Sequence, residues 1–313
     1  MKIRSPLTNL RNTELVDVLD ISFIIDCYKK QLNIDISRFF QGIKKIQIYK
    51  CLDTGYRFYY PFNTSGDSKF YEDLEKFSWY YMDWKWEHEI ANNIIEPKDR
   101  VLEIGCGRGS FLKKIQQKGA DCIGLELNEN AVLYRQDKKL NIFNESIQNH
   151  AKNNPERYDV VCSFQVVEHI AEIKEFLQAS VETLKPGGKL IISVPNNDSF
   201  IFLENKLILN MPPHHMGLWD INSLINIQQF FGLRVKYIHI EPLQRYHQGY
   251  AKDLLNLKLS EKMHNKLGFL ANVLQNPIAK IVNFNVATMS PYINGHTILV
   301  VYSKFEKFWQ VQP

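Results

Sequence analysis

The sequence of 313 residues contains few cysteines and no recognisable cysteine motif. Its five cysteines are an odd number without Cys-x-x-Cys spacing, and most of them sit in apolar, strand-like runs. A reduced thiol in such a run behaves as a small hydrophobic group. A disulfide framework and a cysteine-rich zinc site are therefore not expected.

Long apolar runs are also missing. The longest, such as residues 21–25 and 297–301, fall far short of the roughly 20 residues that cross a bilayer. The first 20 residues include Glu14, Asp17 and Asp20 and lack the basic-then-apolar order of a secretory signal. We expect no membrane span and a cytoplasmic location.

Charge of one sign is scarce. Lys and Arg number 38 against 34 Asp and Glu, which gives a net charge of +4, and the two signs are interleaved. This pattern is not the electrostatic footprint of a nucleic-acid-binding protein, so nucleic acid is not expected as a partner. A hydrophobic content of 45% is ample for a buried core and excludes a disordered chain.

The texture of the chain predicts three regions. Residues 1–97 form an aromatic-rich N-terminal extension, and residues 98–241 together with 296–313 form an α/β domain. Residues 242–295 form a helical insertion, or lid, before the last strand. In the central region β-branched runs alternate with helical periodicity, which indicates a doubly wound, mostly parallel sheet.

A glycine-rich turn follows the first strand of this domain. Gly105, Gly107 and Gly109 come directly after Glu103 and Ile104, at the place where open α/β sheets bind ligands. A dinucleotide fingerprint needs a third glycine where this chain has Ser110 or Leu112, depending on the register. No Gly-Lys-Ser/Thr follows, so a Walker-type phosphate loop is excluded as well.

A second acid, Glu126, ends the next strand. A carboxylate at this position can accept two hydrogen bonds from a ribose diol. The segment from about 100 to 200 resembles the class I S-adenosylmethionine-dependent methyltransferases. The resemblance rests on the glycine-rich turn, on Glu126, on the run from Tyr158 to His169 and on the second turn, Leu184-Lys185-Pro186-Gly187-Gly188. The alternative is a plain tight turn in a parallel sheet.

The resemblance implies a Rossmann-like seven-stranded sheet and S-adenosyl-L-methionine as the cofactor. It places Glu103 at the ammonium group of the cofactor, the glycines under its methionine part, and Glu126 at its ribose. Leu127 and the pair after the third strand would surround the adenine, with Glu145 as an alternative for the acidic contact. The full set of expected cofactor residues is Glu103, Gly105, Cys106, Gly107, Gly109, Glu126, Leu127, Ser146, Ile147, Phe164 and Gln165.

Three histidines are candidates for the catalytic base or for a substrate ligand, because an imidazole titrates near neutral pH. His169 begins the helix after the fourth strand, and His214 with His215 lies in a Pro-Pro-His-His loop after the fifth. A capping or core role is the alternative for each. Adjacent histidines on an extended segment point in opposite directions, so we expect no metal site.

The aromatic extension and the loop resemble a bacterial branch of the same family. In its relatives a hairpin of the extension can carry paired cysteines, whereas here only Cys51 is present, and this also argues against zinc. Tyr80 and Trp86 of the extension and Trp219 of the loop are the expected substrate contacts. Packing of the extension onto the sheet is the alternative for its aromatic residues.

The sequence therefore predicts an S-adenosylmethionine-dependent methyltransferase that acts on a small-molecule or glycan-like acceptor, with oxygen as the expected methylated atom. Two alternatives stay open: an N- or C-methyltransferase of a natural-product intermediate, and a non-catalytic cofactor-binding regulatory protein. Homodimer formation is also left open. A DNA amino-methyltransferase is disfavoured, because its Asn/Asp-Pro-Pro-Tyr/Phe motif is replaced by Ser163-Phe164-Gln165-Val166.

Overall fold

Runs of β-branched and apolar residues form the central sheet of the computed structural model, which describes residues 3–77, 80, 82–135, 137–200, 207–267, 285–286 and 288–306. The sheet has seven strands in the order β10-β11-β8-β7-β4-β5-β6. Five neighbours, β8 to β6 in that order, run parallel, whereas β11 runs antiparallel to both of its neighbours, β8 and β10. The strands are β4 (Arg100–Ile104), β5 (Asp121–Leu125), β6 (Asn141–Phe143), β7 (Tyr158–Phe164), β8 (Leu184–Pro195), β10 (Leu233–Pro242) and β11 (Asn294–Lys304).

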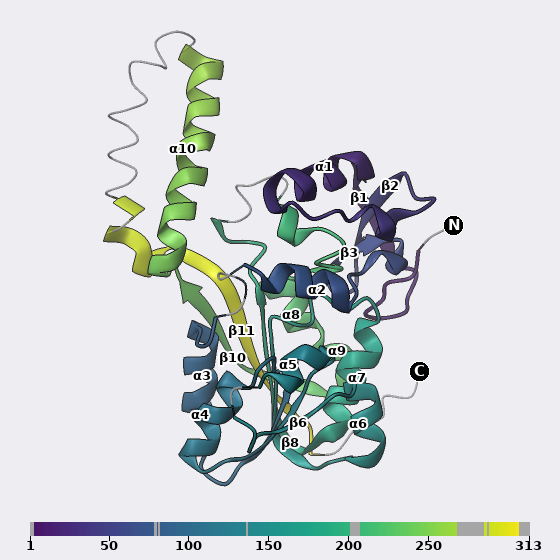
Figure 1. Ribbon diagram of the computed structural model, residues 1–313, viewed down its shortest axis with the longest axis vertical. Helices are drawn as coiled ribbons and strands as arrows, with labels where there is room; N and C mark the ends of the chain where they lie inside the picture. The colour runs from purple at the N-terminus through teal and green to yellow at the C-terminus, as the bar shows by residue number, and fades with distance from the viewer. Residues whose placement is uncertain are drawn as a thin grey trace.

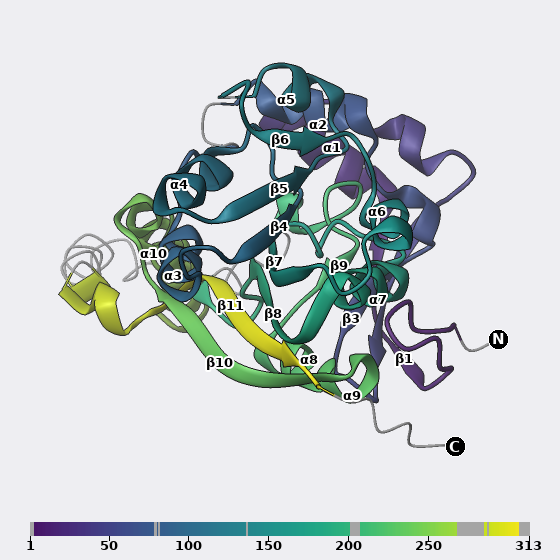
Figure 2. The same cartoon turned by 90° about the horizontal axis from the view of Figure 1, so that it is seen from below.

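Helices cover both faces of this sheet, as the view from below in Figure 2 shows. One face packs against α3 (Trp86–Ile94) and α4 (Ser110–Lys118), which contribute Ala91, Phe111 and Ile115 to a buried cluster. The other face packs against α6 (Ile147–Asn153), α7 (Ile173–Thr183), α8 (Ile221–Asn226) and α9 (Gln228–Phe231). Side chains of β4 alternate between the two clusters, Val101 in one and Leu102 in the other. The predicted α/β fold with a mostly parallel seven-stranded sheet is confirmed.

The N-terminal part of the chain builds a second, smaller sheet. Its strands are β1 (Thr13–Asp20), β2 (Lys45–Cys51) and β3 (Arg57–Tyr60), and its order is β1-β2-β3-β9. The fourth strand, β9 (Gly217–Leu218), comes from the Pro-Pro-His-His loop and pairs with β3. Helices α1 (Ile21–Leu32) and α2 (Ser68–Glu75) complete this part, which lies above the carboxyl ends of the large sheet in Figure 1.

The remaining elements are short or peripheral. Helix α5 (Glu129–Leu133) follows β5, and the 3-10 turns are η1 (Ser37–Phe40), η2 (Phe62–Thr64), η4 (Ile208–Asn210) and η5 (Ser290–Tyr292). Helix α10 (Arg245–Leu267) precedes β11 and projects away from the sheet in Figure 1, which agrees with a helical insertion before the last strand. None of the helices in the described ranges is long and apolar enough to span a membrane.

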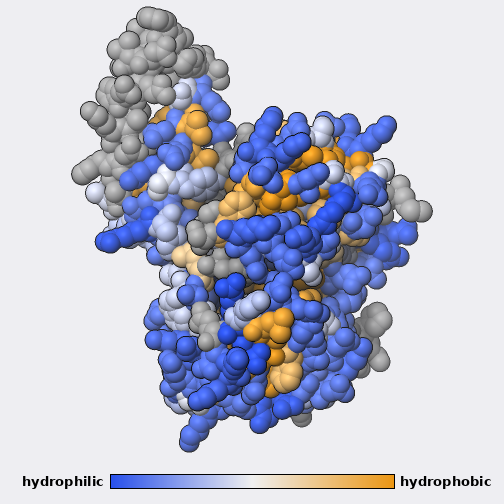
Figure 3. Space-filling view, viewed as in Figure 1, coloured by the Kyte–Doolittle hydropathy of each residue, from blue (hydrophilic) through white to orange (hydrophobic). Residues whose placement is uncertain are grey.

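The surface seen in Figure 3 is mostly hydrophilic, with apolar side chains gathered over α1 and around α5. Around α5 the exposed large apolar side chains include Leu127 and Leu133. Leu127 also lines the large cavity described below. The patch around α5 therefore continues into that cavity.

Candidate functional site

A large cavity opens at the carboxyl ends of β4, β5 and β7, beneath the N-terminal part of the chain. At one end it is lined by Glu103, the glycine turn and Glu126, and at the other by His169, His214 and His215. Phe164 and Gln165 line the stretch between these ends. The structure thus brings most of the predicted site residues to one continuous cavity.

The turn after β4 leaves no room for a side chain at Gly105. Gly105 has φ +74°, and a Cβ atom there would lie 2.5 Å from Val166 Cγ2. Its N–H and that of Cys106 donate to the Leu125 carbonyl, at 2.8 and 3.1 Å, which ties the turn to the end of β5. Gly105, Cys106 and Gly107 line the cavity, whereas Gly109 lies outside its lining and immediately precedes α4.

Glu126 is fixed by backbone donors. Its Oε2 accepts from Gly107 N–H and its Oε1 from Asn128 N–H, both at 2.8 Å. A carboxylate offers about four acceptor positions, so these donors leave capacity for a diol. The pKa of Glu126 is raised by burial.

Glu103 is the buried acid at the bottom of this end. Its Oε2 has no hydrogen-bond partner among the described residues, and burial, followed by the nearby Glu126 carboxylate, raises its pKa well above the usual range. A buried carboxylate without a fixed cation is costly unless a positive group of a ligand pairs with it. The orphaned oxygen therefore fits the ammonium group of the predicted cofactor.

The expected adenine residues follow β5 and β6. Leu127 is 61% exposed on the cavity wall, and Ile147 is buried in it. Ser146 accepts a hydrogen bond from Asn149 N–H, 3.3 Å away, and so caps α6. The neighbouring Glu145 contacts His150, so its carboxylate already has a partner.

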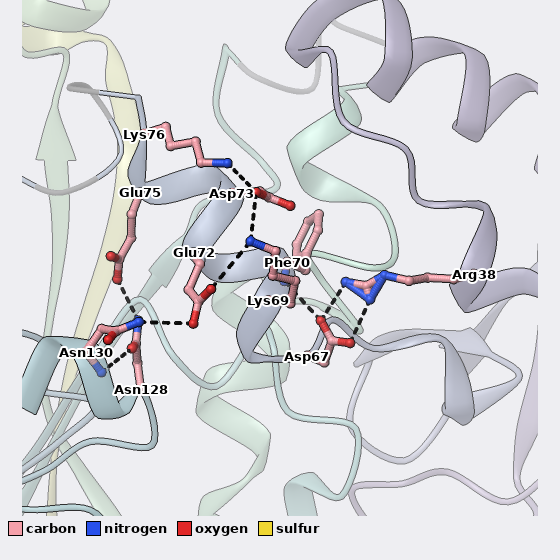
Figure 4. Close-up of polar contacts among 10 residues, drawn as sticks. All are labelled: Arg38, Asp67, Lys69, Phe70, Glu72, Asp73, Glu75, Lys76, Asn128 and Asn130. Atoms are coloured by element: carbon pink, nitrogen blue, oxygen red, sulfur yellow. Dashed lines mark hydrogen bonds and ion pairs between the residues drawn. The ribbon is translucent and has the colours of Figure 1, made fainter.

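Hydrogen bonds connect helix α2 to the segment after β5 at this end of the cavity (Figure 4). Glu75 Oε1 accepts from Asn128 Nδ2, at 2.6 Å, and Glu72 Oε1 from Asn130 Nδ2, at 3.1 Å. Asp67 caps the start of α2. The N-terminal part of the chain thus holds the loop that carries Glu126 and Leu127.

Phe164 and Gln165 lie at the end of β7. The Phe164 ring packs edge-on against Phe111, with centroids 4.9 Å apart. Gln165 has φ +55°, and its Nε2 donates to Glu87 Oε1 at 3.3 Å. Glu87 is a buried lining residue whose pKa is raised by burial, and sequence reasoning did not single it out.

The three histidines at the other end form one cluster. The ring centroid of His169 lies 4.6 Å from that of His214 and 4.9 Å from that of His215. The rings of His214 and His215 stack, with centroids 4.5 Å apart and an interplanar angle of 18°. Burial lowers the pKa of all three, that of His169 to about 4. The rings are therefore neutral at physiological pH.

Hydrogen bonds define the tautomer of each ring. Nδ1–H of His169 donates to the His214 carbonyl at 2.6 Å, and that of His214 to the Leu209 carbonyl at 2.7 Å. Nδ1–H of His215 donates to Asn210 Oδ1 at 2.9 Å, and the Asn210 amide is oriented by donating to Asn197 Oδ1. Carbonyl oxygens only accept, so each Nε2 keeps its lone pair. At His214 this lone pair accepts from the Tyr80 hydroxyl, 2.9 Å away.

The expectation that His214 and His215 point in opposite directions is wrong. The loop is a turn rather than an extended segment, since the N–H groups of both histidines donate to the Met211 carbonyl, at 3.1 and 3.2 Å. In a turn adjacent side chains do not alternate as they do in a strand. Both imidazoles consequently lie on the side of His169.

Backbone contacts with distant segments hold this turn. Gly66 N–H donates to the Pro213 carbonyl at 2.7 Å, and Tyr59 N–H to the Met216 carbonyl at 3.0 Å. On the opposite side Met216 and Gly217 N–H both donate to the Glu168 carbonyl. The small sheet and the end of β7 thereby position the histidines together.

The three expected substrate residues lie in different places. Tyr80 lines the cavity beside His214, whereas Trp86 packs against the buried cluster of α3 and α4. Trp219 is 1% exposed and packs against Tyr56 at an interplanar angle of 40°, with centroids 4.3 Å apart, outside the cavity lining. Its placement in the core gives no support to a substrate contact.

Glu168 is a lining residue that sequence reasoning missed, although it precedes His169. It is 1% exposed, and its Oε2 has no hydrogen-bond partner in the described part of the chain. Its Oε1 lies 3.9 Å from His169 Nε2. Burial raises its pKa to about 8.

A doubly wound sheet with a glycine turn after its first parallel strand and an acid after the next is the arrangement of Rossmann-like nucleotide-binding domains. The family model described as "Methyltransferase domain" matches residues 78–238, about half of the chain. The chain belongs to this methyltransferase family. Its cofactor is S-adenosylmethionine, as predicted, and the orphaned Glu103 oxygen and the glycines of the turn fit that molecule.

Known proteins agree at the level of fold and class. The ubiquinone biosynthesis O-methyltransferase of Aliivibrio fischeri is 30% identical over 147 residues, which are 44% of this chain and 61% of that protein. The same enzyme of Serratia proteamaculans is 28% identical over 157 residues, or 47% and 63%. The chain thus spans about three fifths of these curated relatives. A methyltransferase structure from Archaeoglobus fulgidus has a TM-score of 0.51 and 21% identity over 75% of this chain and 99% of that one.

Proposed function

We propose that the protein transfers a methyl group from S-adenosylmethionine to a hydroxyl oxygen of a small molecule. The observation that carries this proposal is the continuity of the cavity from the glycine turn to three neutral imidazoles. The curated relatives are named for O-methylation, which supports oxygen as the receiving atom. A hydroxyl of a glycan-like molecule stays within the proposal as a second type of acceptor.

The cofactor end of the cavity binds and orients S-adenosylmethionine. Glu103 pairs with an ammonium group, the bare Cα atoms of the glycine turn allow close approach, and Glu126 holds a diol. Bound there, S-adenosylmethionine supplies a methyl group on a positively charged sulfur. Phe164 and Gln165 then border the space between this group and the histidines.

The acceptor end of the cavity must remove a proton from the acceptor hydroxyl. When a hydroxyl oxygen attacks the methyl carbon, the C–O bond forms, the C–S bond breaks and the hydroxyl proton must leave. The lone pairs at Nε2 of His169 and His215 can take it, because Nδ1–H of each ring is already donated to an oxygen. We therefore place the acceptor hydroxyl at the histidine cluster, with Tyr80 beside it.

Calorimetric titration tests the cofactor end. S-adenosylmethionine and its demethylated product should bind to the wild type, and Glu126→Ala should weaken both by at least about tenfold, because a charge-assisted contact is lost. Glu129→Ala, an exposed position in the first turn of α5, is the matched control. Equal affinity of the Glu126 variant would remove the ribose contact, and absence of wild-type binding would end the proposal.

A transfer assay tests the acceptor end. Labelled S-adenosylmethionine is offered with panels of phenols, sugar hydroxyls, amines and activated carbon acids, and the methylated atom is identified by NMR. Methoxy products are expected, with His215→Ala lowering kcat by about 10²–10⁴ at unchanged cofactor affinity. Methylation at nitrogen or carbon would overturn the oxygen proposal. Intact cofactor binding without transfer to any of these acceptors would favour a non-catalytic binding protein.

A further inference from the structure

The histidine cluster has a feature that proton transfer alone does not require. His169, His214 and His215 each present one potential ligand atom, and these atoms lie within 4.8 Å of one another. A single general base needs one imidazole and a group that orients it. Three neutral imidazoles in one buried place are instead a donor set that d-block cations prefer.

The hydrogen bonds behind the rings point the same way. Each of the three rings donates Nδ1–H to an oxygen behind it, two to backbone carbonyls and one to Asn210 Oδ1. Histidines that bind metals almost always make such a bond with the nitrogen that does not bind, because it fixes the tautomer and the ring orientation. Here the pattern occurs three times and leaves all three Nε2 atoms as the potential ligands.

The charges of the cavity favour a bound cation. In the described part of the chain its lining contains eight carboxylates, Asp67, Asp83, Glu87, Glu103, Glu126, Glu145, Glu168 and Glu172, but only two fixed cations, Lys85 and Arg108. Glu103 and Glu126 lie at the cofactor end. Glu168 lies at the cluster, buried and with one oxygen unpartnered among the described residues. A divalent ion on the imidazoles would give this carboxylate the opposite charge that burial demands.

We propose that Nε2 of His169, His214 and His215 bind one divalent d-block cation, with Zn²⁺ as the best match. Three imidazoles with a fourth position left open are the arrangement of catalytic rather than structural zinc sites. Zn–N distances of about 2.0–2.1 Å require the three nitrogens to approach to about 3.4 Å, so the rings close slightly on the ion. The Tyr80 hydroxyl, which now donates to His214 Nε2, moves aside to the open position.

The open position faces the place that the proposed function gives to the acceptor hydroxyl, and this consequence rests on that function. A hydroxyl bound to the cation has a lower pKa, so its proton is lost to water before the methyl group arrives. The cation then replaces a free imidazole as the group that makes the oxygen nucleophilic. Glu168 neutralises part of the charge that remains.

Metal binding is measured directly, without reference to methyl transfer. The chelator-treated full-length protein is titrated with Zn²⁺ by calorimetry and with Co²⁺ by visible absorption, and Mg²⁺ serves as a hard cation for comparison. We expect one Zn²⁺ or Co²⁺ per chain, a tetrahedral Co²⁺ spectrum, and no comparable Mg²⁺ binding, because Mg²⁺ prefers oxygen ligands. His169→Gln and His215→Gln should abolish the spectrum.

Two further variants separate ligation from misfolding. Asn210→Ala, which removes the oxygen behind His215, should weaken Zn²⁺ binding by about 10–100-fold. His239→Gln, on β10 outside the cavity lining, should leave it unchanged. An S-adenosylmethionine affinity equal to that of the wild type shows that a variant is folded. Failure of the wild type to bind Zn²⁺ and Co²⁺ at one site, or equal binding by the cluster variants, would overturn the proposal.

The role toward the acceptor is tested separately. With an acceptor found in the transfer assay, removal of the cation should lower kcat at least tenfold and Zn²⁺ or Co²⁺ should restore it. Unchanged transfer after verified removal would overturn this role while leaving the binding site. Loss of S-adenosylmethionine binding, by contrast, would count against the proposed function and not against the metal site.

Discussion

The buried carboxyl group of Glu241, at the end of β10, should make the stability of the protein depend on pH. Its Oε1 accepts from the Tyr246 hydroxyl at 2.8 Å and its Oε2 from Thr297 N–H at 3.0 Å, and burial raises its pKa to about 7. The folded state therefore binds a proton more tightly than the unfolded chain does, so the stabilisation is complete below about pH 4.3 and is lost as the pH rises through 7.

We predict that Glu241→Gln flattens this dependence. Between about pH 4.5 and 7 the free energy of unfolding of the wild type should fall by about 2–3 kcal/mol more than that of the variant. Urea unfolding at several pH values measures the difference, with the exposed Glu14→Gln as control. Parallel curves for wild type and Glu241→Gln would contradict the prediction.

Single residues differ in how far the sequence identifies them. The glycine turn and Glu126 could be found because their spacing along two strands is itself the signal. Glu87 and Glu168 could not, since their importance comes from burial, and burial depends on segments far along the chain. The orientation of His214 and His215 was missed for the same reason, because the turn that sets it is held by Gly66 and Tyr59.

Strand β9 shows what a very short element contributes. Gly217 N–H donates to the Glu168 carbonyl, and a Cβ atom at Gly217 would lie 2.0 Å from the Tyr56 hydroxyl oxygen. That hydroxyl has no hydrogen-bond partner among the described residues, so Tyr56→Phe should be nearly neutral. The close approach of Gly217 to Tyr56 thus keeps the histidine turn against the small sheet.

We predict that Gly217→Ala destabilises the protein by about 1–3 kcal/mol, as overpacking of a core does. Combined with Tyr56→Phe the loss should be smaller than the sum by roughly 1 kcal/mol, since the nearest clash is removed. Urea unfolding of the four proteins measures this coupling. Strict additivity would show that the ring does not restrict the strand.

Elements of the large sheet could be predicted because their patterns are local. The capping residue Asp220 and the glycine at 232 predict one helix between them, and the helix does begin after Asp220, but it is divided into α8 and α9 at Ile227. The small sheet was not predicted, because its strand β9 has two residues and pairs with a hairpin more than 150 positions earlier. Such a pairing leaves no periodicity in the sequence.

Across the whole molecule, the N-terminal part and the α/β domain share their cores. One buried cluster joins Tyr56 and Phe58 of the N-terminal part to Leu177 and Val300 of the domain. Another joins Tyr28 to Met211 and Met216 of the histidine loop. The aromatic texture that distinguishes residues 1–97 in the sequence therefore corresponds to packing against the rest of the chain.

This sharing predicts that the chain unfolds as one cooperative unit. Scanning calorimetry should show a single transition with equal calorimetric and van't Hoff enthalpies. At a hundredfold excess over its dissociation constant, the demethylated cofactor should stabilise that one transition by about 2.7 kcal/mol. Two transitions, of which the cofactor shifts only one, would mean that residues 1–97 fold apart from the domain. In that case the small sheet could not be what holds the three histidines in place.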